Sequence, residues 1–178
     1  MRSSTSTQSS NVPLRRVVAD RAVVVSNTTP LINLAGVGLL DLLPNLYGSI
    51  AVAEVVVAEY EAKARADDQD LRRVGWLTVV TIAIPDDLAV RLDRGEAATI
   101  ALALQLQPRL VLLDERRGRR VAREHGLPII GTGAVLVEAK REGLIPAVAP
   151  VLDAMIAQGR YISEQLRLTL LQGAGEQP

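Results

Sequence analysis

The sequence has no cysteine and no phenylalanine, and it contains a single histidine, His125. Without cysteine the chain can form no disulfide, no thiolate zinc site and no cysteine nucleophile. A lone histidine cannot build a histidine-rich metal centre. Any metal ion would therefore be held by oxygen ligands, which favour Mg²⁺ or Mn²⁺.

Aromatic residues make up only 2% of the 178 residues, while Lys plus Arg and Asp plus Glu number 20 each. So few rings exclude an extended aromatic platform of the kind on which RNA bases stack. A net charge of zero excludes attraction of the whole molecule to nucleic acid, so any such attraction must be local. The hydrophobic fraction of 48% is enough for a core, which must be aliphatic.

The N-terminal segment is polar and lacks the apolar stretch of a signal peptide. No apolar run approaches the roughly 20 residues needed to cross a bilayer. These features predict a soluble, cytoplasmic protein that does not contact membrane. We expect a disordered leader over 1–21, one folded domain over 22–172 and a flexible tail over 173–178.

Short β-branched runs alternate with helical patterns from about residue 22 onward. The runs predict five strands, at 22–25, 49–52, 77–82, 110–113 and 127–130. The patterns predict helices starting near Pro30 and at 39–44, 54–64, 86–92, 96–106, 115–124, 132–141, 148–157 and 163–171. This alternation favours an α/β fold, a three-layer sandwich with a central five-stranded parallel sheet flanked by helices.

Four polar side chains occupy positions that suggest a common site. Asn27 follows the first predicted strand and Asp114 the fourth, and ligands of open parallel sheets gather at the carboxyl ends of strands. Glu59 and Glu96 lie on predicted helices beside apolar residues, where a freely solvated acid is unusual. Together these oxygens could hold a hard cation.

Each position also has a structural explanation, which the sequence leaves open. Asp114 could cap the helix that follows it. Glu96 could complement the dipole of a first helical turn. Glu59 could pair with Lys63 one turn later, and Asn27 could satisfy its own backbone in a turn.

The order and spacing of eight short segments match a known family. They are SNTTPLI at 26–32, VVAEY at 56–60, GEAA at 95–98, LLDE at 112–115, RRVA at 119–122, GTG at 131–133, AKREGLI at 139–145 and GRYIS at 159–163. On these segments the sequence resembles the PIN-domain family, and most closely the prokaryotic branch grouped with VapC-type toxins. The resemblance runs from about residue 23 to 171.

The resemblance implies a five-stranded parallel sheet and a Mg²⁺- or Mn²⁺-dependent endoribonuclease, often the toxin of a toxin–antitoxin pair. It also implies that Asn27, Glu59, Glu96 and Asp114 are the catalytic and metal-binding residues, with the Thr28 hydroxyl beside the first of them. The family pattern has aspartate where this chain has Asn27. An amide carbonyl can bind a hard cation but brings no charge, so we expect weaker metal binding and weaker activity.

Further residues could contact RNA. Five arginines lie at 116, 117, 119, 120 and 123, which is the strongest local charge in the chain. Such a run is commonly a solvated helix face, but its start beside Asp114 makes phosphate contacts by Arg119 or Arg120 a second interpretation. Thr132 could cap its helix or contact the site. Glu115 could start its helix or reach the site through water.

Two other functions compete with a nuclease. The first is an inactive PIN-like binding module that keeps its partner or RNA contacts, and Asn27 favours it. The second, a small-ligand or nucleotide-binding domain, is disfavoured because the chain has neither a G-x-G-x-x-G motif nor a P-loop. Ala- and Leu-rich helices leave open a homodimer or a groove for an antitoxin helix.

Overall fold

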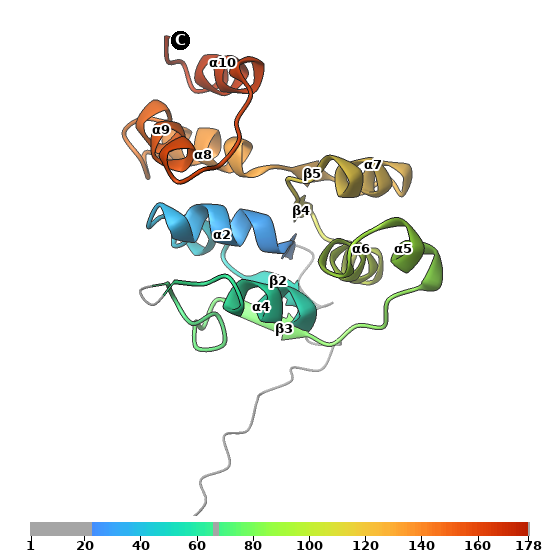
Figure 1. Ribbon diagram of the computed structural model, residues 1–178. Helices are drawn as coiled ribbons and strands as arrows, with labels where there is room; N and C mark the ends of the chain where they lie inside the picture. The colour runs from blue at the N-terminus through green and yellow to red at the C-terminus, as the bar shows by residue number, and fades with distance from the viewer. Residues whose placement is uncertain (1–22, 66–67, 178) are drawn as a thin grey trace, which may run out of the picture.

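The computed structural model describes residues 23–65 and 68–177, and the leader expected at 1–21 lies outside them. It contains one sheet of five strands, all parallel, in the order β3-β2-β1-β4-β5 (Figure 1). The strands are β1 Val24–Ser26, β2 Ile50–Ala53, β3 Leu77–Val80, β4 Leu110–Leu112 and β5 Ile129–Ile130. The predicted α/β architecture with a five-stranded parallel sheet is confirmed.

Helices cover both sides of the sheet. Their bounds are α2 Thr28–Gly36, α3 Leu42–Tyr47, α4 Glu54–Glu61, α5 Asp86–Arg91, α6 Arg94–Leu106, α7 Arg116–Glu124, α8 Thr132–Arg141, α9 Ala149–Ala157 and α10 Glu164–Gly173. Figure 1 shows α5, α6 and α7 grouped on one side of the view and α2, α8, α9 and α10 on the other. Within the described ranges, no helix is long and apolar enough to cross a membrane.

The core is aliphatic, as the composition predicts. Val24 and Val25 on β1 and Val111 and Leu112 on β4 are completely buried. Central strands of a parallel sheet are covered on both faces, which is why these runs are apolar throughout rather than alternating. Each such side chain contributes about 1.5–3 kcal/mol through its removal from water.

Two helix boundaries differ from the prediction for clear reasons. The short helix expected to end at Pro44 instead runs from Leu42 to Tyr47. Pro44 occupies its first turn, where a missing N–H breaks no helical hydrogen bond. The helix expected to begin at Glu96 begins at Arg94, because Asp93 caps it and forms a capping box with Glu96.

Strand order reverses between β1 and β4, a place where ligands of open parallel sheets bind, and the strand ends there are called the β1–β4 crevice. The chain proceeds from β1 outward to β2 and β3, and then returns to place β4 and β5 on the other side of β1. Ser26 is paired in register with Leu112. Asn27 and the residues after Leu112 therefore leave the sheet at the same edge, at the point where strand order reverses.

The C-terminal end is held against the domain by Glu176. Its carboxylate accepts hydrogen bonds from the backbone N–H groups of Val148 and Ala149 at 2.6 and 2.9 Å. It also forms an ion pair of 2.9 Å with Lys140. The carboxylate thus occupies the N-terminus of α9, where free N–H groups and the helix dipole favour negative charge.

Candidate active site

Asn27 and Glu115 meet across the β1–β4 crevice. Asn27 is buried at the N-terminus of α2, and its side-chain amide donates to Glu115 Oε2 at 3.2 Å. The hydroxyl of Thr29 donates to the other oxygen of Glu115. The carbonyl oxygen of Asn27 faces α6, where the hydroxyl of Thr99 lies.

The carbonyl oxygen of Asn27 has only a weak partner. Thr99 Oγ lies 3.2 Å from it, but the same hydroxyl lies 2.8 Å from the backbone carbonyl of Gly95. A hydroxyl carries one proton, and the shorter contact takes most of it. Asn27 Oδ1 is therefore a buried carbonyl oxygen with coordination capacity to spare.

Glu59 joins this group from α4. Its Oε2 accepts a hydrogen bond of 2.6 Å from the hydroxyl of Thr28, the residue after Asn27. A Cβ at Gly95 would lie 2.6 Å from Glu59 Oε1, so the glycine leaves the space that this carboxylate occupies. The pairing of Glu59 with Lys63 that the sequence left open is not among the ion pairs of the described residues.

Glu96 is a buried acid, only 3% exposed. Its Oε1 accepts from the backbone N–H of Gly118 in the first turn of α7 at 3.0 Å, and its Oε2 faces the N–H of Asp93 at 3.4 Å. Burial raises the pKa of Glu96, the negative charges of Asp93 and Glu115 raise it further, and the two backbone hydrogen bonds oppose them. The carboxyl group of Glu96 therefore holds a proton more readily than that of an exposed glutamate.

Asp114 has hydrogen-bond partners of its own on α8 and α2. Thr132 donates to it twice, from its backbone N–H to Oδ1 at 2.7 Å and from its hydroxyl to Oδ2 at 2.5 Å. Asn33 donates to Oδ2 at 3.1 Å. Asp114 lines a cavity beside α9 and α10, whereas Glu59 lines a different one beside β3.

Asp114 and Glu115 diverge because the chain is extended where β4 ends. Glu115 has φ −66° and ψ 129°, and successive side chains of an extended segment point to opposite sides. Only one of two adjacent acids can then face Asn27, and that one is Glu115. In the sequence, Glu115 was noticeable because it follows Asp114 directly. That position does not indicate which of the two side chains faces Asn27.

Three other residues named from the sequence lie on α7 and α8. Thr132 does not cap α8 with its side chain, since its hydroxyl is used by Asp114. Arg119 is half-buried and donates to the backbone carbonyl of Leu113 at 2.8 Å. Its burial and the neighbouring Arg123 lower the pKa of the guanidinium, while Asp114 opposes that shift. Arg120 is exposed, 3.9 Å from Glu124.

The arginines of α7 form one continuous surface. Arg116, Arg117, Arg119, Arg120 and Arg123 line a shallow groove of about 710 Å³. Arg116, which lines this groove, directly follows Glu115 in the sequence. Local positive charge therefore adjoins the acidic group, although the protein has no net charge.

The donors around Asn27 suit a hard divalent cation in their chemistry. Every one is an oxygen, from the amide of Asn27 and the carboxyl groups of Glu59, Glu96 and Glu115. Each carboxylate is now directed at a hydroxyl or amide of the protein. Over residues 23–65 and 68–177, no three acidic or histidine side chains already converge as a preformed metal cluster.

Comparison with known proteins gives one positive result. A protein-family model described as a PIN domain matches residues 23–176, which is most of the chain. No curated protein matches it.

Proposed function

The chain belongs to the PIN-domain family, and from that premise we propose that it is a metal-dependent endoribonuclease whose centre lies at the β1–β4 crevice. PIN domains have a nuclease-type function and in general depend on a divalent metal. The proposal is supported by the Asn27–Glu115 contact, which joins the ends of β1 and β4 where strand order reverses, with Glu59 bonded to the neighbouring Thr28 and Glu96 close enough to Glu115 to feel its charge.

Asn27, Glu96 and Glu115 are the residues we assign to hold Mg²⁺ or Mn²⁺, with Glu59 beside them. Such an ion, when bound, supplies an activated water and balances charge on the scissile phosphate. Asn27 contributes a neutral carbonyl oxygen, which lowers the charge of the site. Thr28 holds Glu59 in place through its hydroxyl.

Asp114 is one of the four residues that the family resemblance implies for the catalytic site. In this proposal it has a role different from that of the other three. Its three hydrogen bonds from Thr132 and Asn33 tie the end of β4 to the starts of α8 and α2. This contact fixes the direction in which Glu115 leaves the strand. Asp114 thereby positions the site, and Arg119 and Arg120 on the neighbouring groove contact the phosphates of RNA.

A direct assay tests the proposal. Purified protein is incubated with a mixed-sequence RNA in Mg²⁺ or Mn²⁺, and its cleavage is compared with that by Glu115→Gln and Asp114→Asn. We expect Glu115→Gln to lose activity while keeping its thermal transition. Equal cleavage by the parent and Glu115→Gln would remove that residue from the centre.

The second candidate function is a binding module that has lost nuclease chemistry. The neutral Asn27 at a position where the family has aspartate favours it. Calorimetric titration with Mg²⁺ separates the two, since a binding module would show no saturable site at millimolar concentration. RNA that is bound but left intact would support this candidate.

The biological setting we propose is that of a toxin neutralised by an antitoxin protein in the cytoplasm, and we extend the proposal to a homodimer of the chain. Induced expression of the chain should then arrest growth, and co-expression of a small protein encoded beside it should restore growth. Arrest that persists with Glu115→Gln would show that it does not come from cleavage.

A further inference from the structure

A cavity of about 540 Å³ opens beside the proposed centre, between α2, the start of α8 and the α9–α10 pair. Its size is typical of a small-ligand pocket. One wall is apolar and includes Leu152, Met155 and Leu170. The facing wall is polar and includes Asn33 and Asp114. The cavity therefore suits a ligand with flat apolar faces and a polar edge.

Two buried polar atoms at this cavity have no hydrogen-bond partner. They are the side-chain oxygen of Asn33 and Nε of Arg160. The amide nitrogen of Asn33 faces Asp114, so its orientation is fixed and the free atom is an acceptor. Leaving such an atom unpaired costs free energy, and native proteins rarely do so without a use.

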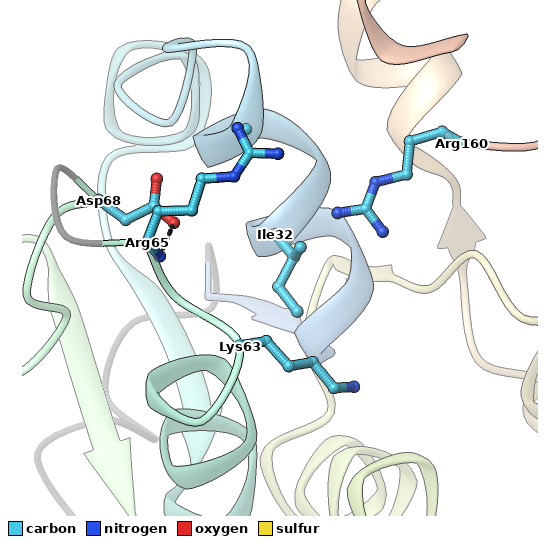
Figure 2. Close-up of a pocket in the computed structure, with 6 residues that line it drawn as sticks. Ile32, Lys63, Arg65, Asp68 and Arg160 are labelled. Carbon is cyan, nitrogen blue, oxygen red and sulfur yellow. Dashed lines mark hydrogen bonds between the residues drawn. The ribbon is translucent and has the colours of Figure 1, made fainter. Parts of the chain in front are cut away.

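Arg160 reaches the cavity from the segment that follows α9. Figure 2 shows its guanidinium directed toward α2, where Ile32 faces a second, smaller cavity that also contains Lys63. Arg160 lines both cavities. Its unpaired Nε is a donor and the side-chain oxygen of Asn33 is an acceptor, so two residues that line the larger cavity each carry one buried polar atom without a partner.

The rim of the cavity carries an aromatic ring and positive charge. Tyr161 is 92% exposed, an unusual position for a large ring, and it lines the opening. Arg116 and Arg119 line the same cavity on the side of the α7 groove. A ligand held here would thus have a ring to stack on and cations to meet an adjoining phosphate.

We propose that this cavity binds one unpaired nucleobase of the RNA next to the scissile phosphate. The inference deepens the proposed ribonuclease function and rests on it. Every nucleobase has apolar faces and an edge with both a donor and an acceptor. Asn33 Oδ1 accepts from that edge, Arg160 Nε donates to it, and Tyr161 stacks on an exposed face.

The absence of an aromatic platform agrees with this mode of binding. An enzyme with many rings would hold several bases without preference, because every base has a stacking face. A single ring combined with a fixed acceptor and a fixed donor selects by the base edge. The cavity therefore gives the nuclease a preference at one nucleotide, and its Arg160 and Tyr161 determine that preference.

Binding of mononucleotides tests the inference without cleavage. The full chain is titrated, in EDTA, with each of the four ribonucleoside 5′-monophosphates and with ribose 5-phosphate, which lacks a base. We expect at least one nucleotide to bind saturably and about tenfold more tightly than ribose 5-phosphate, as one stacked base would give. We also expect the four nucleotides to differ among themselves.

Two variants and one control identify the cavity as the site. Tyr161→Ala and Arg160→Leu should each weaken the preferred nucleotide about tenfold and bring it close to ribose 5-phosphate. Ile156→Ala on α9 is the control, since Ile156 is a partly exposed apolar residue that does not line the cavity. Because Tyr161 is almost fully exposed, its replacement leaves the fold intact.

Specific outcomes overturn the inference. These are saturable binding of none of the four nucleotides, equal binding of ribose 5-phosphate, or unchanged affinities in Tyr161→Ala and Arg160→Leu. A cavity occupied instead by an apolar peptide would give the first result. The nuclease proposal is tested separately. Nucleotide binding without RNA cleavage in any metal would contradict the nuclease proposal alone. RNA cleavage without base-dependent nucleotide binding would contradict the nucleobase proposal alone.

Discussion

The side-chain amide of Asn27 donates to the carboxylate of Glu115 at 3.2 Å, across 88 residues of sequence. An aspartate in place of Asn27 would set two carboxylates against each other at this distance. Here the amide nitrogen donates to Glu115, and the carbonyl oxygen lies 3.2 Å from the hydroxyl of Thr99. The contact joins the start of α2 to the end of β4 through a hydrogen bond from a neutral amide to a carboxylate.

Replacement of Glu115 by Gln tests its role in the centre. It removes one negative charge from the group around Asn27, and we expect RNA cleavage to fall about 100-fold, as loss of one strong electrostatic contact commonly gives. Glu142→Gln is the control, since Glu142 lies exposed at the end of α8. Initial rates in Mg²⁺ and melting curves of both variants check the result, and equal rates would contradict the assignment.

Replacement of Asn27 by Asp should have opposite effects with and without metal. Two carboxylates about 4 Å apart repel by about 4 kcal/mol at an effective dielectric of 20, so the metal-free variant should melt at a lower temperature. Mg²⁺ should raise its melting temperature by more than it raises that of the parent, and cleavage should increase. A variant whose melting temperature does not respond to Mg²⁺ would argue against a cation at this position.

Replacement of Gly95 by Ala should separate stability from activity. The new methyl group would overlap the carboxylate of Glu59 and displace it. Alanine also has a better helix propensity than glycine by about 1 kcal/mol. We therefore expect stability to be kept or raised while cleavage and Mg²⁺ affinity fall. Unchanged activity would mean that Glu59 does not contribute.

The arginine groove of α7 predicts salt-dependent RNA binding. Both Arg117 and Arg120 are exposed there. Changing both to Gln should weaken RNA binding and reduce the slope of log affinity against log salt by about 1.4, from about 0.7 for each phosphate contact of a single strand. Arg73→Gln, in the loop before the edge strand β3, is the matched control and should leave the slope unchanged.

Glu176 predicts a pH dependence of stability. Burial opposes ionisation of its carboxylate, but hydrogen bonds from Val148 N and Ala149 N and the charge of Lys140 prevail and lower its pKa to about 2 from a usual value of 4.5. A lowered pKa stabilises the fold above pH 4.5, and this contribution is lost as pH falls toward 2. Glu176→Gln should therefore be less stable than the parent at pH 7.

The comparison across pH supplies the check. Urea unfolding of the parent and of Glu176→Gln should show a difference that is constant from pH 7 to about 5 and shrinks below 4.5. Glu142→Gln should show no comparable loss at pH 7. A difference that stays the same down to pH 3 would mean that the charge of Glu176 is not what stabilises the end of the chain.

The sequence by itself determined the fold and the edge of the sheet where polar residues gather. Apolar β-branched runs form strands wherever they can be buried on both faces, so the positions of β1 and β4 follow from local composition. Asn27, Glu59 and Glu96 could be named for the same reason, since each is a polar residue at a strand end or on an apolar helix face.

Only the tertiary structure decided which acid of the pair Asp114 and Glu115 faces Asn27. That choice depends on the direction in which the chain leaves β4, and on Thr132 and Asn33, which hold Asp114 and come from distant segments. Nothing in the sequence indicated the cavity lined by Asn33 and Arg160, or the unpaired atoms of these two residues. Periodicity specifies which residues are buried, whereas side-chain direction and hydrogen-bond partners depend on how separate elements pack.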